Sequence, residues 1–445
     1  MRSIIWLPIP ALLAISVGAC IIEVDTEPDT RALSFWQDVA PIYYDNCVTC
    51  HQNGGVAPFA LDNYEDAKRW ARPAQIATEQ RIMPPWLVTD DGSCGDFADS
   101  RWLSERDIAT IAAWVEQGAR EGTPRTDLTV PAQPALEGAS AYTTPTFVPE
   151  VVSDGPTLFD EYRCFVIDPA LGADTYITGY EVVPGTPAIV HHVLAAHIDP
   201  DQVVAADGTT NRELIHSLDA ASPDRDGWPC YGLGDGGIEP LGLPVTWAPG
   251  MGVVEYPTDT GVRAPKNSLL VVQIHYNLAN EAVRGLSDST TIKLRYRDRV
   301  EREGLFELPD GLIDAYVDGQ PVALPPGQDS FEFTWEGEYS AEMAALGVDH
   351  IDLYGVFPHM HERGRSWQLE IERADGSRTC AGEVESWDFD WQFFYFYRQP
   401  IRVEAGDTVR VTCRYDTRGA DAPILPGWGT QDEMCVAGLY LVMPE

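Results

Sequence analysis

Two groups of residues in the sequence have the types and the spacing that metal chemistry requires. The first is Cys47, Cys50 and His51, which stand in the order Cys-Val-Thr-Cys-His. Two thiols three positions apart reach the two vinyl groups of one porphyrin, and the imidazole of the next residue falls beneath the iron. A redox-active pair or half of a zinc site would use the same thiols, but a zinc site needs a second Cys-x-x-Cys, which the sequence lacks. The spacing therefore predicts one covalently bound haem c.

A second axial ligand for this iron is expected some tens of residues later. Met83 lies in a proline-flanked turn, and an axial thioether there would favour the reduced iron and raise its potential. The alternative is that Met83 fills a gap in a core, as methionine often does. One apolar stripe at helical spacing precedes the haem motif, and a second follows Ser104. Residues 34–121 therefore resemble a small cytochrome c domain.

The second group is histidine. Apart from His51, the histidines are His191, His192, His197, His216, His275, His350, His359 and His361. Alternate residues of a strand share a face, so His359 and His361 can contact one ion without distortion. His191 and His192 are neighbours, so they can do so only where the strand bulges. Such pairs suit copper, zinc or iron, although each could also be an ordinary surface or core histidine.

The local sequence patterns indicate the elements that must position these groups. Residues 122–149 are rich in Pro, Ala, Ser and Thr, which predicts an extended linker. Beyond the linker, short runs of β-branched and aromatic residues are broken by Gly and Pro, a pattern typical of antiparallel sandwiches. The length of this half predicts two of them in tandem. We therefore expect a multidomain chain with a small all-α domain followed by two jelly-roll-like β-sandwich domains.

Charge and the N-terminal residues restrict the partners and the compartment. The net charge of -39, from 30 Lys+Arg against 69 Asp+Glu, excludes a nucleic-acid partner. Residues 1–19 have the order of an export signal, and their ending before Cys20 resembles the lipobox of bacterial lipoproteins. That resemblance implies a lipid on Cys20, which would anchor the protein to the bacterial envelope at the outer membrane, on its periplasmic or surface face. Ordinary signal cleavage is the alternative.

Four short motifs follow one another in the second half of the chain. They are Val-His-His-Val at 190–193, Gln-Ile-His-Tyr at 273–276, His-Met-His at 359–361 and Asp-Glu-Met-Cys at 432–435. In type and in order they resemble the type II copper, ascorbate-dependent monooxygenases, the family of peptidylglycine α-hydroxylating monooxygenase and dopamine β-monooxygenase. The resemblance implies two copper ions. The implied ligands are His191, His192 and His275 for one copper and His359, His361 and Met434 for the other.

The family also implies a reaction and a division of the chain. Oxygen and a small organic substrate would react at the copper held by His359, His361 and Met434, so that a C–H bond becomes hydroxylated and the second oxygen atom leaves as water. The other copper would supply an electron. Two imidazoles with a soft thioether favour Cu(I), which suits this assignment. The implied copper domains are residues 150–288 and 289–445, facing a solvent cleft, with a disulfide between Cys413 and Cys435 beside the methionine.

Departures from the family narrow the expected substrate. The peptide-amidating members have an Arg just before the His-x-His motif that binds the substrate carboxylate, whereas this chain has no Arg between 347 and 360. Peptide amidation is therefore not expected. Phe357, Val436, Trp387 and Trp391 favour an apolar or aromatic substrate if they face the cleft, although such side chains are more often simply core.

Four cysteines remain for other disulfides. Cys164 and Cys230 are a candidate pair in the first sandwich, whereas Cys94 and Cys380 have no clear partners. Together with Cys413 and Cys435 they make six cysteines, which allow about 15 connectivities.

The combination of modules predicts how electrons are supplied. A haem on the same chain raises the effective concentration of a donor for the coppers, and an external donor would recharge it. The predicted function is a copper-dependent monooxygenase with a built-in cytochrome. Two rivals remain: a non-catalytic copper-binding, electron-transfer lipoprotein, and a haem peroxidase, which Met83 disfavours because it would close the open iron position that a peroxidase needs.

Overall fold

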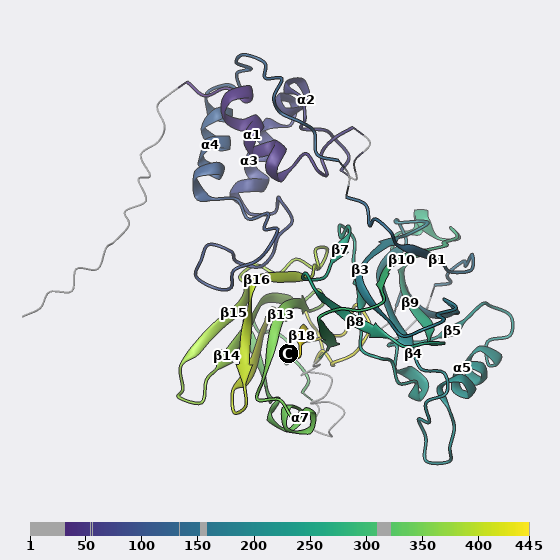
Figure 1. The fold of residues 1–445 in the computed structure, drawn as a ribbon. Helices are drawn as coiled ribbons and strands as arrows, with labels where there is room; N and C mark the ends of the chain where they lie inside the picture. Colours follow the sequence, from purple (N-terminus) through teal and green to yellow (C-terminus); the bar gives the residue numbers. More distant parts are fainter. Residues whose placement is uncertain are drawn as a thin grey trace, which may run out of the picture.

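The computed structural model describes residues 32–444 apart from 54, 56, 133, 152–157 and 309–321. The predicted export signal and the lipid site at Cys20 lie outside the described residues. Figure 1 shows a helical part, purple to blue, standing apart from a larger β-sheet part that extends from teal to yellow. Within the described ranges, no helix has both the length and the apolar character needed to cross a bilayer.

The helical part forms around a core of its own. Its elements are η1 (Phe35–Val39), α1 (Ala40–Asn46), α2 (Tyr64–Arg69), α3 (Ala71–Glu79) and α4 (Glu105–Glu116). The Ser104 side chain accepts a hydrogen bond from the Asp107 backbone N–H and so caps α4, as the sequence predicts. Phe35, Ile111 and Trp114 are fully buried in this core, and α1 ends immediately before Cys47.

The first sandwich lies between residues 140 and 297. One layer is a five-stranded sheet in the order β5 (Trp228–Pro229), β2 (Asp160–Ile167), β9 (Leu269–Asn277), β4 (Val190–Ile198), β6 (Val245–Trp247). The other layer contains β1 (Ser140–Thr143), β10 (Thr291–Arg297), β3 (Thr175–Val183) and β8 (Thr260–Ala264), with β7 (Val254–Glu255) beside β3. The connections contain α5 (Asn211–Ala220), η2 (Asp235–Gly237) and η3 (Glu281–Val283).

The second sandwich is built from the remaining strands. One sheet has the order β12 (Phe331–Glu338), β17 (Thr408–Tyr415), β14 (Gly364–Glu372), β15 (Arg378–Val384). The facing strands are β11 (Arg302–Glu307), β18 (Val436–Val442), β13 (His350–His359) and β16 (Tyr395–Glu404). A short helix, α7 (Ser340–Leu346), packs its Met343 into the core of this sandwich.

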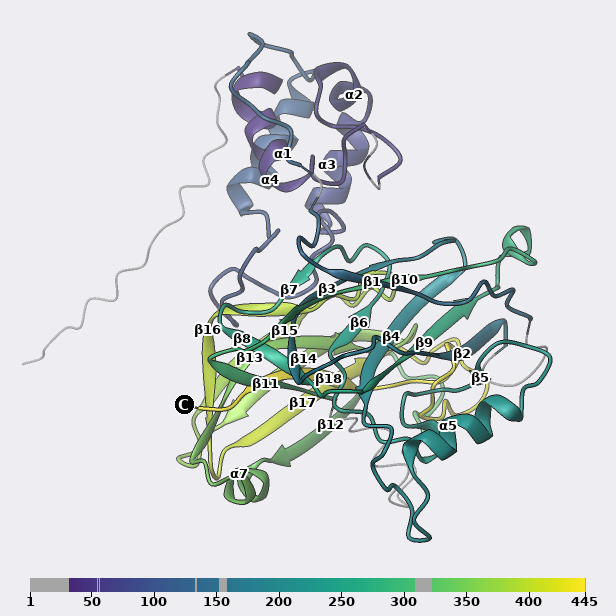
Figure 2. The ribbon, with the colours of Figure 1, turned by 45° about the vertical axis from the view of Figure 1, so that its right-hand side comes forward.

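The two sandwiches share one sheet (Figure 2). Strand β8 pairs in parallel with β11, so one layer of each sandwich joins into a single nine-stranded sheet. The Tyr440 hydroxyl on β18 donates to Thr260 Oγ1 on β8 across the junction, at 3.0 Å. Hydrogen bonding therefore continues from one domain into the other, although a division between two separate sandwiches was expected.

The structure also differs from the expected domain boundaries. Strand β1 lies inside the predicted 122–149 linker, and β10 lies after the predicted boundary at 288/289. Both belong to the first sandwich, because β1 pairs with β10 and β10 pairs with β3. Strand β1 at the edge of this sheet and β10 beside it come from segments far apart in the sequence, and local composition does not predict such pairing.

Three disulfides join the described cysteines. Cys164–Cys230 is the candidate pair of the first sandwich, and Cys413–Cys435 is the pair that the family resemblance implies. The third, Cys94–Cys380, joins residues 286 positions apart and was left open by the sequence. Cys47 and Cys50 are not disulfide-bonded.

The packing at the junction between the sandwiches requires a glycine at position 304, and this requirement can be tested. This residue lies on β11 between β8 and β18, and a Cβ added there would meet the ring and hydroxyl of Tyr440. We expect Gly304→Ala to lower the free energy of unfolding by about 1–3 kcal/mol, because the ring must move and loses its bond to Thr260. Urea denaturation measures this. Gly172→Ala is the matched control, since an added Cβ there meets nothing within 4 Å; an equal loss in both variants would contradict the prediction.

Candidate copper centre

The first histidine group forms where a strand bulges. His191 and His192 lie on β4 and His275 lies on the neighbouring β9. The register between these strands shifts between Val190 and His192, which places His192 directly opposite His275. The bulge brings the two adjacent imidazoles toward one point, as the sequence required, and one ring nitrogen from each of the three histidines lies within 4.8 Å of the others.

The nitrogens of this group suit a metal ion. His191 Nδ1, His192 Nε2 and His275 Nδ1 are buried and have no hydrogen-bond partner among the described residues. Burial lowers the pKa of His191 to about 3 and also lowers the pKa of His192, so both rings are held neutral, the form that binds a metal. Unpaired buried nitrogens cost free energy, and an ion such as copper would use their lone pairs.

Two residues of β2 support His275. Asp160 Oδ1 lies 3.1 Å from His275 Nε2, a short electrostatic contact without hydrogen-bond geometry, and it accepts a hydrogen bond from Asn277. The Tyr162 ring stacks on the His275 ring, with their centroids 4.1 Å apart. A carboxylate behind a histidine orients the ring and leaves the opposite nitrogen, here Nδ1, for a ligand.

The second group lies where β13 and β18 meet. His359 ends β13, His361 follows it, and Met434 immediately precedes Cys435 and β18. The ring centroids of His359 and His361 are 5.1 Å apart. Both rings and the thioether of Met434 line the same cavity. The alternation predicted from strand geometry therefore brings these side chains together.

Hydrogen bonds fix how both rings are presented. His359 Nδ1 donates to Gln392 Oε1 at 2.5 Å, and the Gln392 amide nitrogen is held by the Phe389 carbonyl, which identifies Oε1 as the acceptor. His361 Nδ1 donates to the Asp432 carbonyl at 3.1 Å. In each ring Nε2 is then the nitrogen with the free lone pair. Burial lowers the pKa of His359 to about 4, so this ring is also neutral.

Glu433 holds the backbone around the second group. Its carboxylate accepts hydrogen bonds from the backbone N–H groups of His361 at 3.0 Å, Arg363 at 2.6 Å and Met434 at 3.4 Å. The Cys413–Cys435 disulfide holds the chain directly after Met434, as the family resemblance implied. Burial raises the pKa of Glu433 to about 8. In the sequence, Glu433 is recognised only as part of the Asp-Glu-Met-Cys motif, and nothing there predicts its hydrogen bonds to the backbone.

The two groups lie close to each other and line one cavity. The ring centroids of His192 and His359 are 5.7 Å apart, and one cavity is lined by His192 and His275 together with His359, His361 and Met434. The groups come from different sandwiches, and they meet because the 428–434 loop of the second sandwich docks on β2 of the first. There the Tyr162 hydroxyl donates to the Trp428 carbonyl and the Thr430 N–H donates to Asp160.

The cavity walls are apolar and aromatic. Among the described residues no Asp, Glu, Lys or Arg lines the cavity. Phe357 and Val436 line it, as predicted, but Trp387 and Trp391 do not. Trp387 is core and donates its indole N–H to the His361 carbonyl. Sequence reasoning missed further lining residues, namely Tyr162, Leu194, Tyr231, Leu243, Thr246, Trp247, Leu308, Gln392 and Trp428.

The remaining histidines have other surroundings. His197 is buried between Ser268 and Tyr296, each within hydrogen-bonding distance of one of its ring nitrogens. His216 is exposed on α5, and His350 contacts Asp349. None of the three lines the cavity, which agrees with their having no ligand assignment.

The predicted haem residues follow α1. His51 Nδ1 donates to the Phe59 carbonyl at 3.1 Å, which leaves Nε2 as the nitrogen with a free lone pair. The thiols of Cys47 and Cys50 are free for thioether bonds. These features fit a c-type haem. Met83 is half-buried and lines a small cavity with Trp86 and Trp102; Cys47, Cys50 and His51 do not line that cavity.

Asp160 gives a prediction for metal affinity. Asp160→Asn removes the carboxylate beside His275, so the first group should lose about 10–100-fold in copper affinity. The second group should lose less, because Asp160 holds its loop only at the Thr430 N–H, whereas Glu433 and the Cys413–Cys435 disulfide still hold Met434. Copper titration followed by the electron paramagnetic resonance of Cu(II) measures both sites. Asp288→Asn is the matched control because Asp288 is an equally buried carboxylate that accepts from Thr186, Tyr276 and Thr290 and contacts none of the proposed copper ligands. Equal losses in the two variants would show that Asp160 acts only on stability.

Buried histidines predict acid sensitivity of the metal-free protein. Burial lowers the pKa of His191, His192, His197, His359 and His361 below the ordinary value of 6.5. Their stabilising effect is present above pH 6.5 and is lost as pH falls toward the folded-state pKa values, because only the unfolded chain then takes up the protons. At pH 5 each costs about 2 kcal/mol relative to pH 7.

Glu433 acts in the opposite sense, because its raised pKa favours folding at lower pH, but it is one group against five. Urea denaturation of the metal-free protein at pH 7 and pH 5 should therefore show a clear loss at pH 5. His197→Phe should make this pH dependence shallower. An unfolding free energy that stays constant over this range would contradict the prediction.

Comparison with known proteins agrees with this geometry. Residues 312–442 match the family model for the C-terminal domain of the copper type II ascorbate-dependent monooxygenases. The chain is 32% identical over 204 residues to tyramine beta-hydroxylase of Caenorhabditis briggsae, covering 44% of this chain and 33% of that protein. It is 24% identical over 345 residues to human dopamine beta-hydroxylase, covering 75% of this chain and 52% of that protein. The chain thus spans from a third to about half of these relatives.

Among solved structures, the major capsid protein P2 of bacteriophage PM2 aligns over 64% of this chain and 98% of its own at 8% identity, with a TM-score of 0.24, which is too low to bear on the fold. This chain is similar to the copper type II ascorbate-dependent monooxygenases, and the match to their C-terminal domain lies over the sandwich that carries His359, His361 and Met434.

Proposed function

We propose that the protein is a copper-dependent monooxygenase that hydroxylates a C–H bond of a small organic molecule with O2. The observation that carries the proposal is that His192 and His275 of one ligand group line the same largely apolar cavity as His359, His361 and Met434 of the other. One group has three imidazoles and the other has two imidazoles and a thioether. When bound there, copper would supply dioxygen activation at the thioether site and an additional electron from the other site.

The residues around the groups prepare the site for this chemistry. Gln392 and the Asp432 carbonyl accept hydrogen bonds from the Nδ1 atoms of His359 and His361, which leaves the Nε2 lone pair of each ring free. Glu433 holds the backbone that carries Met434. Apolar and aromatic side chains form most of the cavity surface, and a surface of this kind limits contact with water, which protects reactive oxygen species from unproductive reduction. Geometry fixed before substrate arrives lowers the cost of reaching the reactive arrangement.

The walls support a neutral apolar or aromatic substrate. Dopamine and tyramine, which appear in the names of the relatives, are amines that carry a positive charge at neutral pH. A buried charge needs a partner, and the described lining residues provide no carboxylate for an ammonium group and no guanidinium for a carboxylate. Phe357, Trp428 and Val436 instead offer apolar surface to a hydrocarbon or an aromatic ring.

The helical part supports a built-in electron supply. His51, with Nε2 free, and the two thiols suit a covalent haem, with Met83 as the proposed sixth ligand. Such a haem would pass single electrons toward the coppers and would be recharged by an external donor. We further propose that a lipid on Cys20 anchors the mature chain in the bacterial envelope, at the outer membrane on its periplasmic or surface face.

Metal content tests the ligand assignment first. We expect two coppers and one iron per chain by elemental analysis. Met434→Ala and His275→Ala should each lower the copper content, whereas His216→Ala, an exposed histidine outside the cavity, should leave it unchanged. Met83→Ala should leave the iron count intact and alter the haem spectrum. Zinc in place of copper, or iron alone, would contradict the monooxygenase proposal.

Oxygen uptake tests catalysis and the substrate class together. With ascorbate as reductant, ethylbenzene should support faster oxygen uptake and alcohol formation than phenethylamine, which has the same ring but a cationic end, because the cavity offers that charge no partner. Faster turnover of the amine would contradict the neutral-substrate assignment. A protein that binds two coppers but hydroxylates neither probe would favour the rival proposal of a non-catalytic electron-transfer lipoprotein.

A further inference from the structure

The segment between Met83 and α4 leaves the helical part and packs into the second sandwich. We call residues 86–98 the strap. Val88 and Phe97 of the strap are fully buried, and both belong to the core of the second sandwich, not to the core of the helical part. Trp86 and Leu87 pack against the same core. The helical part is therefore held to this sandwich by buried contacts as well as by its linker.

The strap closes an open side of the sandwich. Strands β15 and β16 are the edge strands of their sheets, and edge strands present unpaired backbone groups. The Thr89 N–H donates to the Glu383 carbonyl at 2.8 Å, and the Ala98 N–H donates to the Phe396 carbonyl at 2.8 Å. The strap thus bonds to β15 at one end and to β16 at the other.

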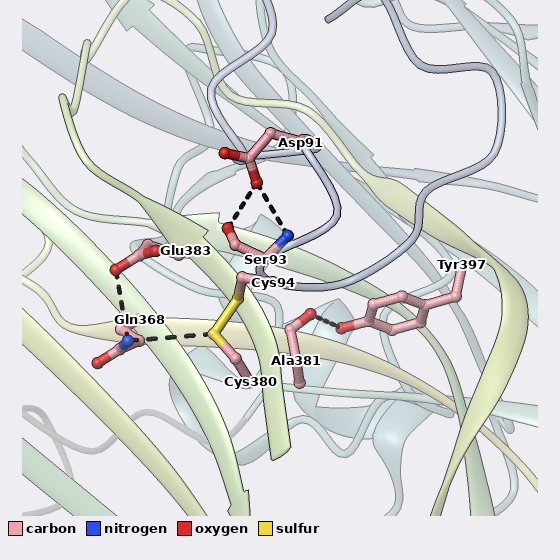
Figure 3. Close-up of a disulfide and its surroundings, with 8 residues drawn as sticks. All are labelled: Asp91, Ser93, Cys94, Gln368, Cys380, Ala381, Glu383 and Tyr397. Atoms are coloured by element: carbon pink, nitrogen blue, oxygen red, sulfur yellow. Dashed lines mark hydrogen bonds between the residues drawn. A yellow bond between two sulfur atoms is a disulfide. The ribbon is translucent and has the colours of Figure 1, made fainter. Parts of the chain in front are cut away.

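A disulfide fixes this arrangement (Figure 3). Cys94 in the strap is bonded to Cys380 on β15. Asp91 accepts hydrogen bonds from the Ser93 N–H and hydroxyl and so folds the turn that presents Cys94. Beside it, the Tyr397 hydroxyl of β16 donates to the Ala381 carbonyl of β15 at 2.6 Å. The position of the strap is therefore set covalently and by hydrogen bonds.

A short series of contacts leads from Met83 toward His359. Met83 and Trp86 line the same cavity. The Trp86 ring lies edge-on to the Tyr395 ring, with centroids 4.8 Å apart, and the Tyr395 hydroxyl accepts from the Leu87 N–H. Three residues before Tyr395 along the chain, Gln392 accepts the hydrogen bond from His359 Nδ1. The contacts end at the second histidine group, on the sandwich to which the strap is bonded.

We propose that the strap is the electron-entry contact, through which Trp86, Tyr395 and Gln392 couple the helical part to His359. This inference rests on the proposed function. It assigns electron entry to the site of His359, His361 and Met434 instead of the three-histidine group. In each transfer one electron leaves iron(II), giving iron(III), and reduces copper(II) to copper(I); no bond forms or breaks, and an external reductant restores the iron.

Flash reduction of the haem in the copper(II)-loaded full chain, without oxygen or substrate, tests the inference. Haem reoxidation should be first order, with a rate constant independent of protein concentration. The Cu(II) resonance of the site of His359, His361 and Met434 should disappear before that of the three-histidine site. Trp86→Leu should slow it several-fold. Trp335→Leu is the matched control, because Trp335 is a half-buried tryptophan that packs on the same core from β12, in the four-stranded sheet that faces the sheet of Tyr395. This substitution should leave the rate of haem reoxidation unchanged.

The outcomes separate this inference from the proposed function. A chain without copper would overturn the proposed monooxygenase function, and this inference with it, whereas a chain with copper but without haem would overturn the electron-entry inference and leave the monooxygenase proposal standing. An unchanged rate in fully loaded Trp86→Leu, or loss of the three-histidine Cu(II) signal first, would overturn the electron-entry role alone.

Hydrogen exchange of the metal-free protein checks docking without any cofactor. The amides of Thr89 and Ala98 should be protected in the wild type and should exchange several-fold faster in a Cys94→Ser, Cys380→Ser double variant, while α4 amides stay unchanged. Unprotected strap amides in the wild type would overturn the docking on which the inference depends.

Discussion

The site depends on the loop from Trp428 to Met434 being held from two sides. On its own sandwich, Glu433 accepts backbone hydrogen bonds from the loop and from the His361 turn. On the other sandwich, Asp160 accepts from the Thr430 N–H, and Tyr162 donates to the Trp428 carbonyl. Asp160 and Tyr162 also contact His275. The residues that orient the first histidine group therefore also dock the loop that delivers Met434, so neither ligand group is placed independently of the other.

This arrangement has an energetic cost that a metal ion would offset. Several ring nitrogens are buried without partners, and burial keeps the rings neutral. Each unpaired nitrogen costs about 1–3 kcal/mol of desolvation. The disulfide next to Met434, the continuous nine-stranded sheet and the cores of both sandwiches supply the stability against which this cost is set. Metal binding would recover it, because a ligand that binds only the folded state stabilises that state.

How much the sequence could predict depended on how local each feature is. Alternation along one strand was enough for His359 and His361, and the adjacency of His191 and His192 correctly required a bulge. The Gln392 bond to His359 and the Asp160 contact with His275 arise from residues brought together only by tertiary pairing, so no local pattern reveals them. α5 was missed although its capping box, Thr210 with Glu213, is a local signal. Strand β1 was hidden in a proline-rich segment, because its partner β10 is about 150 residues away.

The strap affects how the helical part, the proposed electron carrier, is joined to the copper-binding sandwiches. A flexible linker raises the local concentration of a donor but leaves its orientation to chance, so every encounter must find a productive geometry. Here Val88 and Phe97 are built into the second core, and Cys94 is bonded to β15. The segment that follows the proposed haem ligand is thus part of the sandwich that holds His359, and the shared sheet carries the same rigidity on to the first sandwich. In this arrangement the strap restricts where the helical part can lie relative to the second sandwich, so the proposed electron delivery would require a smaller search than a flexible linker alone would allow.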